Sequence, residues 1–310
     1  MPPGQRDGPR QQVISDSPPR RQAARAAKRG FDGWYAWASQ YAQSAGVVLT
    51  PGACRPDFGR GVLRQNGRIV LECDDPVQLA AGAMLFTAGE WMGRLREQFV
   101  VFHAAALGHD EGALLIVGES GAGKTTLAEA LVHRGFAYFG DEFAAVCPAH
   151  MEVAPLPVTM FVKSCARARA MSPALAAEVL ECPPRFTLPG GPTFCCVPRR
   201  EIVPNPGRRF PVRWIVLLTG GRKWGGLGTC PGAGGLATRP TPADPGPGEI
   251  ARRLCLGAQC FNAASFAAAT ALARRAVCRI MDRADLTEMA DAVVALVGGP
   301  PAELQTGAFA

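Results

Sequence analysis

The 310-residue chain is 48% apolar and 19% charged, a composition that excludes an intrinsically disordered protein and allows a sizeable buried core. Its net charge of +7 is unevenly placed, because residues 1–30 hold seven Arg or Lys against two Asp. The rest of the chain is therefore close to neutral, and we expect no nucleic-acid partner.

The eleven cysteines do not suggest a disulfide framework. Their number is odd, none has C-x-x-C spacing, and no N-terminal apolar stretch resembles a signal peptide. No apolar run is long enough to cross a membrane. We therefore expect a cytoplasmic protein with free thiols and no membrane association.

Composition and hydrophobic periodicity predict three regions: a disordered basic tail at 1–30, a small α+β region at 31–98, and a larger domain at 99–310. In the second region, aromatic residues at helical spacing predict a helix over Gly33–Gln43. A strand is predicted over Arg68–Cys73 and a second helix over Asp75–Gln98.

The third region opens with alternating strand and helix patterns. In chain order these are a strand at Phe99–Leu107, a strand at Ala113–Val117, a glycine loop, a helix at Thr125–Arg134 and a strand at Phe136–Phe139. This order predicts an α/β fold, with a mixed sheet that contains a phosphate loop and is flanked by helices.

Beyond these elements, Val212–Thr219 has the apolar pattern of a buried strand. Fifteen of the 30 residues in 220–249 are Gly or Pro, so we expect a long flexible loop there. Two closing helices are predicted near Phe261–Ala276 and Thr287–Val297.

The glycine loop Gly118–Thr125 fits the phosphate-loop pattern G-x-x-x-x-G-K-[ST] at every required position. Glycines allow successive backbone N–H groups to surround a phosphate, and the following helix adds the positive end of its dipole. A lysine at this position reaches the β- and γ-phosphates, and a threonine hydroxyl ligates Mg²⁺. The residues expected to hold ATP are Gly118, Glu119, Ser120, Gly121, Ala122, Gly123, Lys124, Thr125 and Thr126.

Two acidic residues, Asp141 and Glu142, end the first strand after the loop helix. If that strand lies beside the strand of the loop, its carboxyl end is close to the γ-phosphate. A carboxylate there can accept a proton from an attacking hydroxyl or hold Mg²⁺. His103, in the middle of the preceding strand, is a further candidate that can tune the pKa of these acids.

Together these residues resemble the HPr serine kinase/phosphorylase family, and more closely its smaller relatives in bacterial peptide-modification clusters. The similarity rests on the segments His103–Ala106, Leu114–Leu127 and Arg134–Glu142. The resemblance implies a fold related to phosphoenolpyruvate carboxykinase and ATP-dependent phosphorylation of a serine on a peptide or small protein. It also implies a possible homo-oligomer.

Carried over by position, the resemblance makes Asp141 the general base, assisted by His103, with Lys124 on the phosphates. Thr125 and Glu142 would hold Mg²⁺. This chain departs from the family in having Lys-Thr where the family has Lys-Ser, and Glu142 where it usually has a second Asp. The longer Glu side chain places its carboxylate one methylene further from the backbone than that of an Asp.

Two alternatives remain open at this point. One is a small-molecule kinase of the shikimate, nucleoside or free-amino-acid type, which would share the loop and the acid. The other is a non-catalytic nucleotide-binding subunit that recruits a peptide, suggested by the Asp-to-Glu change.

Overall fold

The computed structural model describes residues 18–44, 54–110, 112–156, 160–163, 185–187, 193–197, 208–219, 245–258, 260–282 and 284–299. The helices are α1 (Pro18–Ser44), α2 (Pro76–Leu95), α3 (Lys124–Val132), α5 (Pro247–Leu256), α6 (Ala263–Arg275) and α7 (Leu286–Leu296). The first strands are β1 (Cys54–Asp57), β2 (Val62–Gln65), β3 (Arg68–Glu72), β4 (Val100–Phe102), β5 (Ala104–His109), β6 (Gly112–Gly118) and β7 (Ala137–Gly140). The later ones are β8 (Ala144–Cys147), β9 (Glu152–Ala154), β10 (Met160–Lys163), β11 (Arg185–Thr187), β12 (Thr193–Val197), β13 (Phe210–Leu218) and β14 (Val277–Met281).

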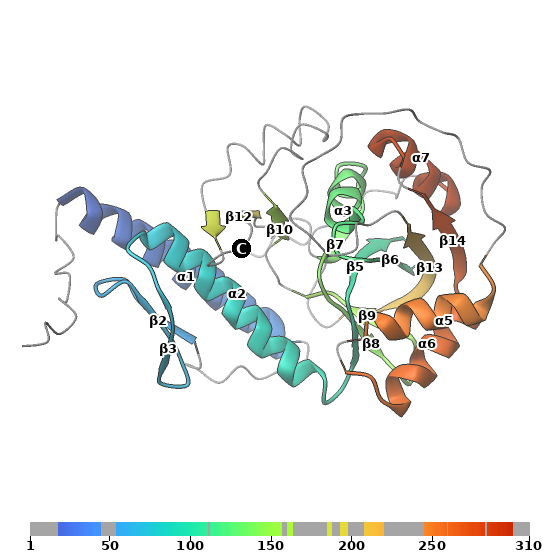
Figure 1. Ribbon diagram of the computed structural model, residues 1–310, viewed down its shortest axis with the longest axis horizontal. Coiled ribbons are helices and arrows are strands. Elements are labelled where there is room, and N and C mark those ends of the chain that lie inside the picture. Colours follow the sequence, from blue (N-terminus) through green and yellow to red (C-terminus); the bar gives the residue numbers. More distant parts are fainter. Residues whose placement is uncertain are drawn as a thin grey trace, which may run out of the picture.

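The N-terminal part is a pair of long helices, α1 and α2, beside the small antiparallel sheet β1-β2-β3 (Figure 1). Trp34 of α1 and Trp91 of α2 stack with ring centroids 6.4 Å apart, and both are almost fully buried. The expectation of a disordered tail is therefore wrong for residues 18–30, which form the first half of α1. The alanines of this basic segment favour helix, and the aromatic residues that follow it bury against α2.

The rest is an α/β unit built on an eight-stranded mixed sheet, as the sequence predicts at the level of fold class. Its strand order is β4-β8-β9-β13-β6-β5-β7, with β14 also paired to β13; a separate small sheet has the order β10-β12-β11. Helices α3 and α7 cover one face and α5 and α6 cover the other (Figure 1). Successive residues of β6 alternate between these two cores, as the two-residue period of a strand requires.

The predicted strand Phe99–Leu107 is two strands in the structure, β4 and β5, interrupted at His103. Although only one residue separates them, β4 and β5 lie towards opposite ends of the strand order. One residue spans only a few ångströms, so the sheet curls until its ends approach each other. The connection from β7 to β8 crosses the same junction and carries Asp141 and Glu142.

The C-terminal part contains two elements that the sequence analysis misses. Helix α5 begins at Pro247, inside the predicted loop 220–249, of which residues 220–244 lie outside the described residues. Strand β14 runs parallel to β13 and extends the sheet. The two predicted closing helices are confirmed as α6 and α7, which begin at capping residues Asn262 and Asp285.

Candidate functional site

The candidate site lies at the edge of the sheet where β6 and β7 end. Both strands are antiparallel to β5, so they run parallel to each other and bring Gly118 and Asp141 to the same edge. His103 precedes β5 at that edge, since Ala104 pairs with Val117. The acid-bearing strand does not lie beside the loop strand, which was the condition for placing its carboxyl end near the γ-phosphate, because β5 lies between them.

The glycines of the loop are required by its conformation. Gly123 precedes α3 in a left-handed conformation, with φ 107°, which a residue with a Cβ adopts only with strain. A Cβ on Gly118 would lie 3.1 Å from the Cβ atoms of Ala122 and Leu218, so the loop packs directly on β13. No side chain caps the start of α3, which leaves its first N–H groups for another acceptor.

Lys124 is 6% exposed and holds the loop closed. Its ammonium donates hydrogen bonds to the carbonyl oxygens of Gly118 at 2.9 Å and Glu119 at 3.3 Å, and to Nε2 of His103 at 3.0 Å. An ammonium is a donor only, so His103 accepts at Nε2 and a neutral ring carries its proton on Nδ1. That nitrogen lies 3.2 Å from Oε2 of Glu142, which completes a Lys124–His103–Glu142 chain.

Asp141 is the most buried acid of the site, with 1% of its surface exposed. Its Oδ1 accepts a hydrogen bond from the hydroxyl of Tyr138 at 2.9 Å, whereas Oδ2 is buried without a hydrogen-bond partner. Burial, followed by repulsion from the Glu142 carboxylate, raises the pKa of Asp141 to about 7. The hydroxyls of Tyr138 and Thr125 oppose this rise in pKa.

The structure thus brings together the residues with predicted chemical roles. His103 contacts Lys124 and Glu142, and the side chain of Thr125 lies next to Asp141. The other residues of the loop differ in exposure: Glu119 and Ser120 are exposed, Gly121 and Thr126 are half-buried, and Ala122 is buried. The described residues contain no cluster of three or more His, Cys, Asp or Glu side chains that would hold a metal by themselves.

Two contacts of the site are absent from the sequence analysis. One is the hydrogen bond from the Tyr138 hydroxyl to Asp141. Buried tyrosine hydroxyls usually find a hydrogen-bond partner, and Tyr138 lies three residues before this acid, so the sequence carried a signal for the contact. The other is the carbonyl oxygen of Gly257, at the end of α5, which accepts a hydrogen bond from the backbone N–H of His103 at 2.6 Å. No local sequence pattern predicts the second contact, because more than 150 residues separate His103 from Gly257.

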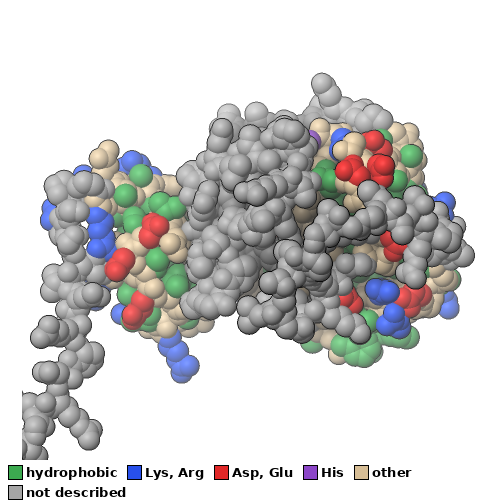
Figure 2. Space-filling view, turned by 45° about the horizontal axis from the view of Figure 1, so that its top comes forward, with side chains coloured by type: hydrophobic (Ala, Val, Ile, Leu, Met, Phe, Trp, Pro, Cys, Tyr) green, Lys and Arg blue, Asp and Glu red, His purple; other side chains and the backbone are tan. Residues whose placement is uncertain are grey.

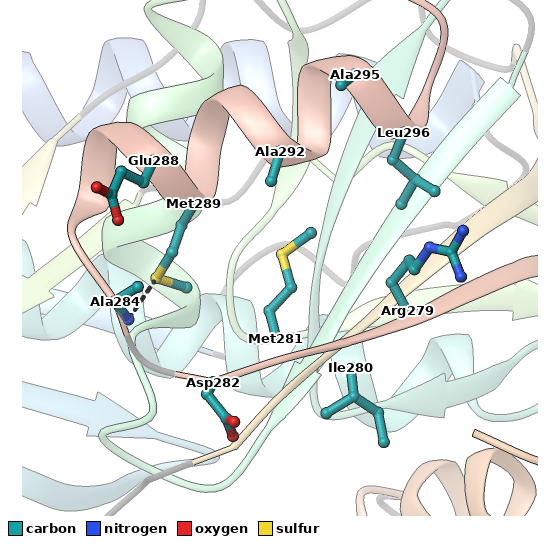
Figure 3. A pocket seen from close by; sticks show the side chains of 10 residues that line it. All are labelled: Arg279, Ile280, Met281, Asp282, Ala284, Glu288, Met289, Ala292, Ala295 and Leu296. Atoms are coloured by element: carbon teal, nitrogen blue, oxygen red, sulfur yellow. Dashed lines mark hydrogen bonds between the residues drawn. The ribbon is translucent and has the colours of Figure 1, made fainter. Parts of the chain in front are cut away.

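A pocket of about 570 Å³ lies between β14 and α7 (Figure 3), and none of the predicted site residues is among those that line it. Met281 projects from β14 towards Ala292 of α7, and Asp282 follows at the end of the strand (Figure 3). The hydroxyl of Thr219 donates a hydrogen bond to Asp282, which ties the ends of β13 and β14 together. These ends lie at the same edge as Gly118, because Gly118 pairs with Leu218 and Leu218 with Met281.

Comparison of the chain with protein-family models and with curated proteins gives no match. Of the helices in the described part of the chain, none combines the length and the apolar character that a membrane span needs. Cys54, Cys73, Cys147, Cys255, Cys260 and Cys278 are free thiols.

Proposed function

We propose that this chain is an ATP-dependent kinase that phosphorylates a serine hydroxyl on a peptide or small protein. The observation that carries the proposal is the position of buried Asp141 at the same sheet edge as the loop Gly118–Thr125. The mixed sheet with helices on both faces is compatible with the fold that the resemblance to HPr kinases implies.

In the proposed reaction, the unpaired Oδ2 of Asp141 accepts the proton of the serine hydroxyl as the serine oxygen attacks the γ-phosphorus. The bond from that phosphorus to the β–γ bridging oxygen breaks, and ADP leaves with the bridging oxygen. A pKa of about 7 suits this role, because the carboxylate is partly ionised at neutral pH and can still hold a proton. Lys124 exchanges its loop carbonyls and His103 for the phosphate oxygens of ATP. His103 and Glu142, released from Lys124, remain paired beside Asp141.

The residues present fit a magnesium ion bound together with the nucleotide. The hydroxyl of Thr125 and the carboxylate of Glu142 supply oxygen atoms at this edge, and Mg²⁺ prefers such ligands together with phosphate oxygens and water. When bound there, Mg²⁺ would neutralise charge on the phosphates. Phosphate oxygens would complete its ligand set, in keeping with the lack of an all-protein cluster in the described residues.

The test is incubation with Mg-ATP and serine-containing peptides encoded beside this gene, with the products analysed by mass. Addition of one phosphate to serine that Lys124→Ala and Asp141→Asn both abolish would support the proposal. Lys28→Ala serves as a matched control, because Lys28 is exposed on α1 and pairs with Asp32. Full activity of Asp141→Asn would show that the assigned base is wrong.

The same assay separates the two alternatives. Phosphorylation of a free hydroxyl compound, such as an amino acid, shikimate or a nucleoside, in place of every peptide would identify a small-molecule kinase. Saturable ATP binding without transfer to any acceptor would identify a non-catalytic nucleotide-binding subunit.

A further inference from the structure

A groove of about 790 Å³ runs between α5 and α6 on the face of the sheet opposite α3. Among the described residues, most of its lining is apolar or small, and the charged side chains that line it are Arg252 and Arg274. Figure 2 shows apolar side chains next to basic and acidic ones at the lower right of the molecule, where α5 and α6 lie in Figure 1.

Three large apolar side chains project into solvent around this groove. Leu256, Phe261 and Phe266 are 72%, 69% and 56% exposed, and all lie at or beside the turn that joins the two helices. Single exposed apolar residues are ordinary on protein surfaces. A cluster that includes two aromatic rings at the mouth of a groove is instead typical of an interaction surface.

The turn between α5 and α6 is hydrogen-bonded to the segment that carries His103. Its residue Gly257 accepts the hydrogen bond from the backbone N–H of His103, and Ala258 forms a β-bridge with Phe102. The groove therefore opens next to the residue that contacts both Lys124 and Glu142. A ligand seated in the groove would extend towards the carboxyl edge of the sheet.

The charges of the groove favour an acidic occupant. Arg252 and Arg253 both pair with Glu249, and these pairs lower the pKa of that carboxyl to about 2, so it stays ionised and engaged. No acidic side chain among the described residues pairs with Arg274. A partner that buries apolar side chains here and also carries a carboxylate would therefore complement both the apolar surface and the charge of Arg274.

We propose that this groove docks the phosphoryl acceptor, a peptide whose apolar side chains cover Leu256 and Phe261 and whose acidic side chain meets Arg274. The assignment rests on the proposed kinase function and specifies its substrate as an apolar, acidic segment next to the serine. A nucleic acid would supply negative charge but no aliphatic side chains for the exposed apolar cluster, so a peptide is the better match.

The test measures binding of short fluorescent peptides to the full chain by anisotropy, without nucleotide. Each peptide has one serine; the first also carries leucines and glutamates, the second replaces its leucines by glycine, and the third replaces its glutamates by lysine. The first should bind about tenfold more tightly than the other two. Phe261→Ser and Arg274→Glu should each remove that preference.

Ile69→Ser and Arg275→Glu are matched controls. Ile69 is also an exposed apolar residue, but it lies on β3, and Arg275 is the neighbour of Arg274; neither residue lines the groove. Both should bind the first peptide as the unchanged protein does. Equal binding of the three peptides, or unchanged binding by Phe261→Ser and Arg274→Glu, would overturn the proposal. So would a dimer that Phe261→Ser converts to a monomer, since a second copy would then occupy the groove.

Failure of the kinase proposal gives a different result. Lys124→Ala should keep the peptide preference while losing ATP, because Lys124 does not line the groove. Peptide binding without phosphate transfer would leave the docking surface supported and the kinase rejected. Phosphate transfer at an unchanged rate in Phe261→Ser and Arg274→Glu would support the kinase and reject the docking surface.

Discussion

The hydroxyl of Tyr138 donates a hydrogen bond to Oδ1 of Asp141 at 2.9 Å, inside a part of the protein that excludes solvent from both side chains. The contact fixes one carboxylate oxygen and leaves the other, Oδ2, without a partner. The proposed base is therefore held through one oxygen, and its other oxygen, although buried, has an unused lone pair that can accept a proton.

Removing this hydroxyl tests the contact directly. Tyr138→Phe keeps the buried ring but removes the donor, so we expect a loss of about 1–3 kcal/mol in the free energy of unfolding. The pKa of Asp141 should rise above its value of about 7, because the hydrogen bond from Tyr138 lowers it. Chemical denaturation and carbon NMR of the carboxyl group measure the two effects. Tyr35→Phe, on half-buried Tyr35 of α1, is the control and should change neither quantity.

The pKa of Asp141 predicts how stability depends on pH. The folded-state pKa of about 7 exceeds the ordinary value of 3.8, so between these values the folded state holds a proton that the unfolded state has lost. The contribution of Asp141 to stability should therefore be greatest below about pH 4, fall as the pH approaches about 7, and then level off. Asp141→Asn removes this decline and should be more stable than the unchanged protein above pH 7, by up to about 4 kcal/mol.

Denaturant titrations at several pH values measure this decline. Glu142→Gln should shift its end to lower pH, because repulsion from Glu142 contributes to the raised pKa of Asp141. An Asp141→Asn protein that keeps the decline would contradict the assignment of the pKa to this residue.

The loop conformation predicts opposite effects for two glycine substitutions. Gly123→Ala places a Cβ at φ 107° and should cost about 1–2 kcal/mol in folding free energy, and it should also weaken ATP binding. Gly89→Ala lies on an exposed turn of α2 with open space around it, so it should stabilise the protein by about 0.5–1 kcal/mol. Thermal unfolding and calorimetric titration with Mg-ATP compare them. Equal effects of the two substitutions would argue against a strained loop.

The contact between Lys124 and His103 predicts that a substitution of His103 affects ATP binding and phosphate transfer differently. His103→Ala removes one acceptor that competes with phosphate for the Lys124 ammonium, so ATP should bind equally well or a few-fold more tightly. Transfer should become slower, because Glu142 loses its imidazole partner beside Asp141. Calorimetry and initial rates with a peptide acceptor measure the two quantities. Loss of ATP binding in this variant would show that His103 supports the loop instead.

Local patterns in the sequence determine much of the fold. The buried strand β6, the loop with Gly123 and the helix α3 follow from adjacent residues, because glycine conformations and helix periodicity act over a few positions. The closing helices α6 and α7 are equally local, as their capping residues show. Residues 18–30 are the exception, since composition predicts disorder there and packing of α1 against α2 favours a helix.

The geometry of the candidate site depends on contacts between distant segments. The sequence predicts that the loop Gly118–Thr125, His103 and the acid pair belong together, but their relative positions depend on a curled sheet whose ends approach each other. Only the tertiary structure divides the strand at His103, inserts β5 between the loop and Asp141, and brings Gly257 to the same place. Burial by these distant segments is also what raises the pKa of Asp141, a property that no run of neighbouring residues encodes.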